Sequence, residues 1–197
     1  MTSSKDKRGR PLRWWRALTL RDRVVIALVS TLIIVAKFYL RLPLHTPGHT
    51  GFFWMALLIV GIGVIKRPGA GTLIGLLTGV LATIFLPSQQ GILVFVKYFT
   101  PGVVADVLWM VFRGGFDRYA IAVVVGASAN AAKLLASYLL GMLLGIPAGY
   151  LALGVGLAAT THVVFGALGG LIGAYILQRL ERAGIPGTSP AEEGYPS

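Results

Sequence analysis

The sequence predicts an all-α integral membrane protein, a six-transmembrane-helix bundle with both termini cytoplasmic. Of its 197 residues, 55% are hydrophobic and 13% are charged, and the mean hydropathy is +0.76. That is too little charge to cover a water-soluble globule of this size. Six long apolar runs, which we interpret as membrane crossings, fill most of the chain between Val24 and Leu177.

The positions of Lys and Arg predict how these runs are oriented. Cytoplasmic loops of membrane proteins carry an excess of Lys and Arg. Fourteen of the eighteen cations lie before the first run, at the second-to-third and fourth-to-fifth junctions, or at the end of the last run: Lys5, Lys7, Arg8, Arg10, Arg13, Arg16, Arg21, Arg23, Lys66, Arg67, Arg113, Arg118, Arg179 and Arg182. The third-to-fourth and fifth-to-sixth junctions have none, so one topology satisfies every junction. The other four cations, Lys37, Arg41, Lys97 and Lys133, break the pattern and carry most of the functional information.

The first three spans are expected at about 24–40, 52–65 and 70–86. Leu18-Thr19-Leu20-Arg21-Asp22 is typical of a helix start, and the first span follows it. Two prolines and two glycines in 42–51 prevent a helix there, so this segment is an outer loop. Lys66-Arg67-Pro68-Gly69 is a tight inner turn between the second and third spans.

The last three spans are expected at about 91–112, 119–144 and 150–177, with 87–90 and 145–149 as outer turns. Pro101-Gly102 predicts a kink in the fourth span. The chain therefore divides into a basic cytoplasmic tail (1–20), a six-helix membrane domain (21–180) and a disordered cytoplasmic tail (181–197), which is rich in Pro, Gly and Glu.

Composition excludes several classes of function. The net charge of +11 is spread over loop ends and is not gathered on one face. This distribution favours contact with the lipid bilayer and predicts that the protein binds no nucleic acid. The chain has no cysteine, hence no thiolate metal site, and no G-x-x-x-x-G-K-[ST] loop for ATP hydrolysis. It also lacks a G-x-S-x-G elbow and an intramembrane carboxylate pair, so we expect neither an enzyme nor a cofactor.

Polar side chains within the spans predict a binding site. Ionisable groups inside a membrane are costly and usually face a cavity or a partner. The candidate substrate-binding residues come from the second, fourth, fifth and sixth spans: Trp54, Lys97, Tyr98, Asn130, Lys133 and His162. They suggest an outward-opening, net basic pocket for a polar or anionic small molecule. Asp106 is expected to form a structural ion pair with Lys133 or Lys97, and Lys37 to snorkel toward the outer surface.

His45 and His49 are candidate residues of an outer gate. Their i, i+4 spacing would bring two imidazoles together on a helix, but Pro47-Gly48 lies between them. A divalent-metal site built from these two with His162 is an alternative, although a loop histidine is more often solvated or hydrogen-bonded. We therefore predict no metal site.

Small residues recur every four positions on two spans. The third span carries Gly71, Gly75, Gly79 and Thr83, and the sixth carries Gly154, Ala158, His162, Gly166, Gly170 and Ala174. The first span has a shorter version of the same pattern, Ala27 and Thr31. Such stripes let helix backbones approach closely within a membrane. They serve either internal packing or a coupling interface for another membrane subunit.

Three segments carry a resemblance to a known family: Leu18–Arg23 before the first span, Ile65-Lys-Arg-Pro-Gly-Ala70, and Ser88-Gln-Gln-Gly91 leading into the fourth span up to Arg113. Together with the six spans, they resemble an S component of an energy-coupling factor (ECF) transporter, nearest the YkoE-like hydroxymethylpyrimidine/thiamine branch. Two features depart from that pattern. The acidic residues of the third and fourth helices are reduced to Asp106, and the A-x-x-x-A coupling motif appears only as Ala27-x-x-x-Thr31.

The resemblance implies a substrate-capture subunit in a prokaryotic cell membrane. Such a subunit works with a transmembrane coupling subunit and two ATPase subunits, and its substrate would be a vitamin or vitamin precursor. The alternatives are a divalent-metal S component of the cobalt or nickel type, and a stand-alone channel or structural membrane protein.

Overall fold

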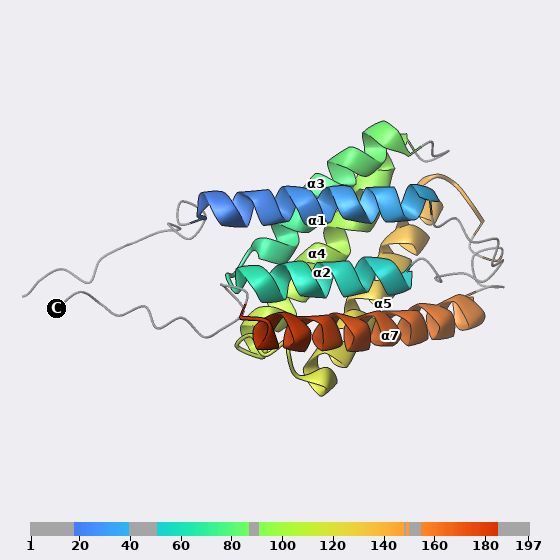
Figure 1. The fold of residues 1–197 in the computed structure, drawn as a ribbon. Helices are drawn as coiled ribbons and strands as arrows, with labels where there is room; N and C mark the ends of the chain where they lie inside the picture. Colours follow the sequence, from blue (N-terminus) through green and yellow to red (C-terminus); the bar gives the residue numbers. More distant parts are fainter. Residues whose placement is uncertain (1–17, 40–50, 87–90, 148, 150–154, 185–197) are drawn as a thin grey trace, which may run out of the picture.

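The computed structural model describes residues 18–39, 51–86, 91–147, 149 and 155–184. Within these ranges the chain is helical and contains no strand (Figure 1). The helices are α1 (Leu20–Tyr39), α2 (Gly51–Ile65), α3 (Ala70–Phe85), α4 (Val94–Val111, after a 3₁₀ turn at Gly91–Leu93), α5 (Tyr119–Leu143) and α7 (Val155–Arg182).

The all-α fold class is confirmed, and the helices follow the predicted spans. By length and composition, α4, α5 and α7 could each cross a membrane, while α2 and α3 are shorter apolar helices. Helix α4 runs through Pro101 without interruption. Helix α7 continues past the predicted end at Leu177 to Arg182, so the predicted boundary of the C-terminal tail at 181 falls inside this helix.

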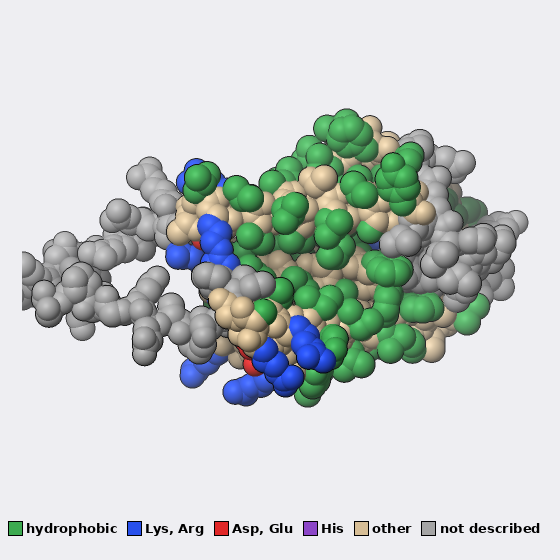
Figure 2. All heavy atoms as spheres, viewed as in Figure 1, with side chains coloured by type: hydrophobic (Ala, Val, Ile, Leu, Met, Phe, Trp, Pro, Cys, Tyr) green, Lys and Arg blue, Asp and Glu red, His purple; other side chains and the backbone are tan. Residues whose placement is uncertain are grey.

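The buried core is centred on α2, which contacts α1, α3, α5 and α7. Its side chains Met55, Leu58, Ile59 and Ile62 are fully buried. Large apolar side chains such as Leu28, Ile84 and Leu135 are instead exposed on the outer helix faces, and hydrophobic side chains cover the side of the bundle seen in Figure 2. An apolar outer surface over an apolar core is what a bundle surrounded by lipid requires.

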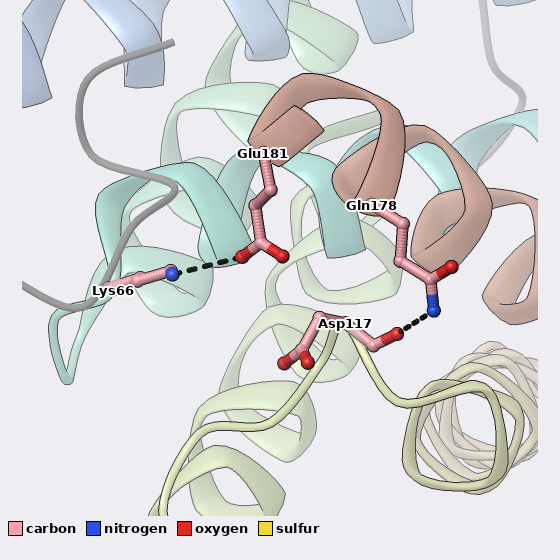
Figure 3. A network of polar contacts seen from close by, with 4 residues as sticks. All are labelled: Lys66, Asp117, Gln178 and Glu181. Carbon is pink, nitrogen blue, oxygen red and sulfur yellow. Dashed lines mark hydrogen bonds and ion pairs between the residues drawn. The ribbon is translucent and has the colours of Figure 1, made fainter. Parts of the chain in front are cut away.

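Charged side chains gather at one end of the bundle, where α1 begins and α7 ends (Figures 1 and 2). We call this the charged end. Arg67 Nε lies 3.3 Å from Asp22 Oδ2, which joins the α2–α3 turn to the start of α1. Lys66 Nζ lies 3.1 Å from Glu181 Oε1, which joins the same turn to α7. Gln178 Nε2 on α7 donates a hydrogen bond of 2.9 Å to the Asp117 carbonyl in the α4–α5 turn (Figure 3).

Local sequence explains two features of this end. The Asp22 N–H donates to Thr19 Oγ1 (3.2 Å) and the Thr19 N–H donates to Asp22 Oδ2 (2.9 Å), a reciprocal cap that begins α1 at the predicted place. The turn before α3 places Lys66 at φ +51° and Gly69 at φ +89°. The tight turn predicted from Lys66-Arg67-Pro68-Gly69 is therefore present.

The glycine stripe of α3 packs against α4, which corrects its assignment to the coupling interface. A Cβ at Gly75 would lie 2.8 Å from the Tyr98 carbonyl oxygen, and one at Gly79 would lie 2.8 Å from the Phe95 ring. A Cβ at Gly71 would meet Ile62 and the Gly102 carbonyl. Because all three glycines are buried inside the chain, they serve internal packing. Ala27 and Thr31 are exposed on α1.

Candidate functional site

A buried aromatic pair lies at the end of the bundle opposite the charged end, which we call the opposite end. Trp54 is in the first turns of α2 and Tyr98 is near the start of α4. Their ring centroids are 6.0 Å apart, and the side chains are only 3% and 1% exposed. Neither Trp54 Nε1 nor Tyr98 Oη has a hydrogen-bond partner in the described part of the chain. Such orphaned polar atoms are uncommon in folded proteins, and a ligand or water normally satisfies them.

Lys133 on α5 faces this pair. Its Nζ atom lies 5.7 Å from the Trp54 ring centroid and 5.4 Å from the Tyr98 ring centroid. Lys37 on α1 approaches the same tyrosine, with Nζ 4.5 Å from the ring centroid. An ammonium within about 6 Å of an aromatic face is attracted by the ring quadrupole. Two lysines from different helices therefore converge on Tyr98.

The sequence interpretation singled out Lys37 as functionally informative but expected it to snorkel toward the outer surface, and it did not predict the contact with Tyr98. The signal was present in the helical spacing. Ile26, Ser30 and Ile33 are buried, and Lys37 continues their face one turn further along α1. Ser30 Oγ donates to the Ile74 carbonyl at 3.2 Å, which holds this face of α1 against α3.

Lys97 and His162 are linked to this cluster through their neighbours. Lys97 immediately precedes Tyr98 on α4 and is partly buried, and the backbone carbonyl of His162 contacts Asn130. His162 Nδ1 lies 2.9 Å from the Ala158 carbonyl oxygen, one turn back on α7.

Asn130 is fully buried and joins α5 to α7. Its Nδ2 atom donates a 2.7 Å hydrogen bond to the His162 carbonyl, while Oδ1 has no partner among the described residues. Gly51, the first residue of α2, lies so close that a Cβ there would overlap the Asn130 amide. The structure thus brings the predicted residues Trp54, Tyr98, Asn130 and Lys133 to one end of the bundle. Lys97 adjoins Tyr98 in the chain, and the His162 carbonyl accepts the hydrogen bond from Asn130.

Asp106 does not pair with either lysine, which corrects the predicted structural ion pair. Its Oδ1 accepts the Gly71 N–H at 2.9 Å, and its Oδ2 accepts the Thr72 N–H at 2.6 Å. Both donors belong to the first turn of α3, whose leading N–H groups have no partner within the helix and whose dipole favours a negative charge. The carboxylate therefore caps α3 from the side, in the half of α4 nearer the charged end.

Comparison with known proteins identifies the family. Residues 23–134 match the model of a family described as "ABC-type cobalt transport system, permease component". The chain belongs to this family. It is also similar in fold to a crystal structure of an S component of an ECF transporter, with a TM-score of 0.56 and 16% sequence identity over 86% of this chain and 88% of that chain. No curated protein matches the sequence.

Membership in this family confirms a multi-pass membrane protein of a transport system, and the fold confirms the predicted likeness to S components. The family name raises the question of a metal substrate. The described residues contain no group of three or more His, Cys, Asp or Glu side chains that could hold an ion. The predicted gate residues His45 and His49 lie outside the described residues.

Proposed function

We propose that this protein is the substrate-capture subunit of an ECF-type importer and that it binds a small water-soluble nutrient at the opposite end of the bundle. The observation that carries the proposal is the cluster around Lys133. Two aromatic rings and a buried amide present unsatisfied polar atoms beside an ammonium group. A folded chain retains such groups where a ligand completes them. The family and the S-component fold support this role.

The proposed topology places this site on the outside of the cell. All six helices cross the membrane, and the charged end, with both termini, lies in the cytoplasm because Lys and Arg concentrate there. The site then faces the medium from which a nutrient is taken up. The 40–50 segment, with His45 and His49, would act as its outer gate.

Transport requires partners in this proposal, since the sequence has no nucleotide-binding loop. A transmembrane coupling subunit and two ATPase subunits would supply the energy. Ala27 and Thr31 are the proposed contact with the coupling subunit. They are exposed on α1, and Thr31 lines an apolar groove of about 520 Å³ between α1 and α3.

We propose a vitamin or vitamin precursor as the substrate. The assignment to the hydroxymethylpyrimidine/thiamine branch rests on the turn motifs, and the aromatic pair suits a flat heterocycle. Two lysines, Lys97 and Lys133, disfavour the positively charged thiamine and favour a neutral or anionic relative such as hydroxymethylpyrimidine.

Reconstitution tests the proposal. The protein alone in proteoliposomes should show no ATP-driven uptake, and uptake should appear when a coupling subunit and two ATPases are added. Uptake driven by ATP with this protein alone would refute the S-component role. Failure to form a complex with any coupling subunit would favour a stand-alone channel or a structural protein.

Cobalt is the second candidate substrate, because the family description names it. If Co²⁺ is the substrate, it should bind the purified protein at micromolar concentration, and Ala substitutions of His45, His49 and His162 together should abolish that binding. If the organic nutrient is the substrate, Co²⁺ binding should be undetectable both in the unsubstituted protein and in the triple variant.

A further inference from the structure

The proposed binding site carries a charge imbalance that identifies its ligand more closely, and the inference rests on the proposed function. The chain has seven acidic residues: Asp6, Asp22, Asp106, Asp117, Glu181, Glu192 and Glu193. Among the four that the structure describes, Asp22 pairs with Arg67, Glu181 pairs with Lys66 and Asp106 accepts the α3 N–H groups. Asp117 lies in the α4–α5 turn at the charged end.

None of the four described carboxylates is therefore placed to neutralise Lys97 or Lys133. The segments 40–50, 87–90 and 150–154, which adjoin the helices at the opposite end, contain no Asp or Glu in their sequence. The three remaining acids belong to 1–17 and 185–197, which join α1 and α7 at the charged end. The structure thus places Lys133 of α5 against Tyr98 of α4, the chain neighbour of Lys97, and no carboxylate of the described residues lies beside either lysine.

An uncompensated ammonium inside the membrane domain is unfavourable. A lysine within a transmembrane helix is unfavourable because its charge loses hydration. Cation–π contact of Lys133 with Trp54 and Tyr98 offsets only part of that cost. The mutual repulsion of the lysines adds to the cost. A bound anion would offset this cost by its attraction to the lysines and would reduce their mutual repulsion.

The polar atoms of Trp54 and Asn130 that have no hydrogen-bond partner among the described residues indicate which other polar groups the ligand carries. Trp54 Nε1 is a donor and requires an acceptor. Asn130 Oδ1 is an acceptor and requires a donor, because its Nδ2 is already used by the His162 carbonyl. We infer that the substrate is a small planar organic anion that presents a carboxylate or phosphate group to Lys97 and Lys133 and an N–H or O–H donor to Asn130. A hydrated divalent cation or a thiazolium ring has the wrong sign for this site.

Matched pairs of compounds test the inference because each pair keeps the ring and changes only the charge. The probes are hydroxymethylpyrimidine phosphate against hydroxymethylpyrimidine, and nicotinate against nicotinamide, with thiamine and Co²⁺ as cations. Binding to the purified full-length protein in detergent is measured by calorimetry and by the shift in Tm. We expect at least one anion to bind at least tenfold more tightly than its neutral partner, and neither cation to bind.

Charge variants then locate the interaction. Lys133→Met and Lys97→Met should each weaken binding of that anion at least tenfold, and Lys133→Arg should retain most of it. Arg182→Met removes one positive charge at the exposed end of α7 and serves as the matched control, with unchanged affinity. If Lys133→Met does not fold, Lys97→Met on the partly buried side of the cluster decides the matter.

Equal binding of acid and neutral partner, binding of thiamine or Co²⁺, or no binding of any anion in the panel would each overturn the inference. These results concern the identity of the substrate and leave the proposed capture role in an ECF-type importer in place. That role fails separately if reconstituted complexes show no ATP-driven uptake of any nutrient.

Discussion

Asp106 shows how a carboxylate is accommodated inside this membrane domain without a cation beside it. Two backbone N–H groups at the start of α3 supply its hydrogen bonds, at 2.9 and 2.6 Å. Hydrogen bonds to a charged acceptor are about twice as strong as neutral ones. The residue therefore ties α4 to α3 at the α3 N-terminus. Its role is structural, as expected, but its partner is a backbone and not a lysine.

This arrangement predicts that Asp106 and Lys133 contribute independently to the free energy of unfolding. Asp106→Asn replaces one acceptor oxygen with an N–H₂ group that faces an N–H donor, so unfolding free energy should fall by about 1–3 kcal/mol. Because Asp106 does not contact Lys133, the loss should be the same in the Lys133→Met background, within about 0.5 kcal/mol. Thermal unfolding of the single and double variants in detergent measures both. Rescue of Lys133→Met by Asp106→Asn would instead show a direct ion pair.

Sequence reasoning located most site residues because intramembrane polar groups are conspicuous against apolar helices. Lys97, Asn130, Lys133 and His162 were identified by type and depth alone. Partners could not be assigned in the same way, since they depend on the rotation of each helix and on its neighbours. Lys37 and Asp106 were therefore given the wrong surroundings.

Close helix contacts hold the bundle together at the scale of its elements. Helix α7 presents glycines on two faces. A Cβ at Gly170 would overlap the Ala122 carbonyl of α5, and one at Gly173 would lie 2.9 Å from Ile59 of α2. Small residues replace the hydrophobic effect as the basis of helix association in a membrane. Hydropathy predicted where each helix lies along the chain, but it could not predict that α7 would pack on both α2 and α5.

Gly170→Ala should destabilise the bundle, because the added methyl group meets backbone atoms that cannot rotate away. The expected loss is about 1–3 kcal/mol, as for other overpacked cores. Gly156→Ala on the same helix is the matched control, since nothing lies within 4 Å of its Cβ position. That control should be neutral or slightly stabilising because alanine favours helix. Equal Tm values for the two variants would contradict the observed α5–α7 contact.

Enlarging the exposed α1 residues Ala27 and Thr31 should, unlike Gly170→Ala, leave the stability of the bundle unchanged. Thr31→Leu and Ala27→Leu should leave the Tm and ligand affinity unchanged, because both residues are exposed. They should reduce co-purification with the coupling subunit at least tenfold if this face is the interface. Thr160→Leu, at an exposed position on α7, provides the control and should assemble normally. Intact complexes in all three variants would remove α1 from the proposed interface.

At the scale of the whole molecule, the two ends differ in the partners available to their charges. At the charged end, Arg67 meets Asp22 and Lys66 meets Glu181, so positive and negative side chains lie close together. At the opposite end, Lys133 meets aromatic rings. The end with paired charges suits contact with anionic headgroups and cytoplasmic subunits. The end with a positive cluster suits capture of a ligand from the medium.

This asymmetry makes the orientation in the membrane testable with single cysteines, since the chain has none of its own. Ile146 is exposed in the α5 turn at the opposite end, and Ala183 is exposed just after α7 at the charged end. In intact cells, an impermeant maleimide should label Ile146→Cys, and it should label Ala183→Cys only after the membrane is permeabilised. The physical reason is that an excess of Lys and Arg would retain the charged end in the cytoplasm. The reverse labelling pattern would place the lysine cluster inside the cell, where it could not capture an external nutrient, and would refute the proposed direction of transport.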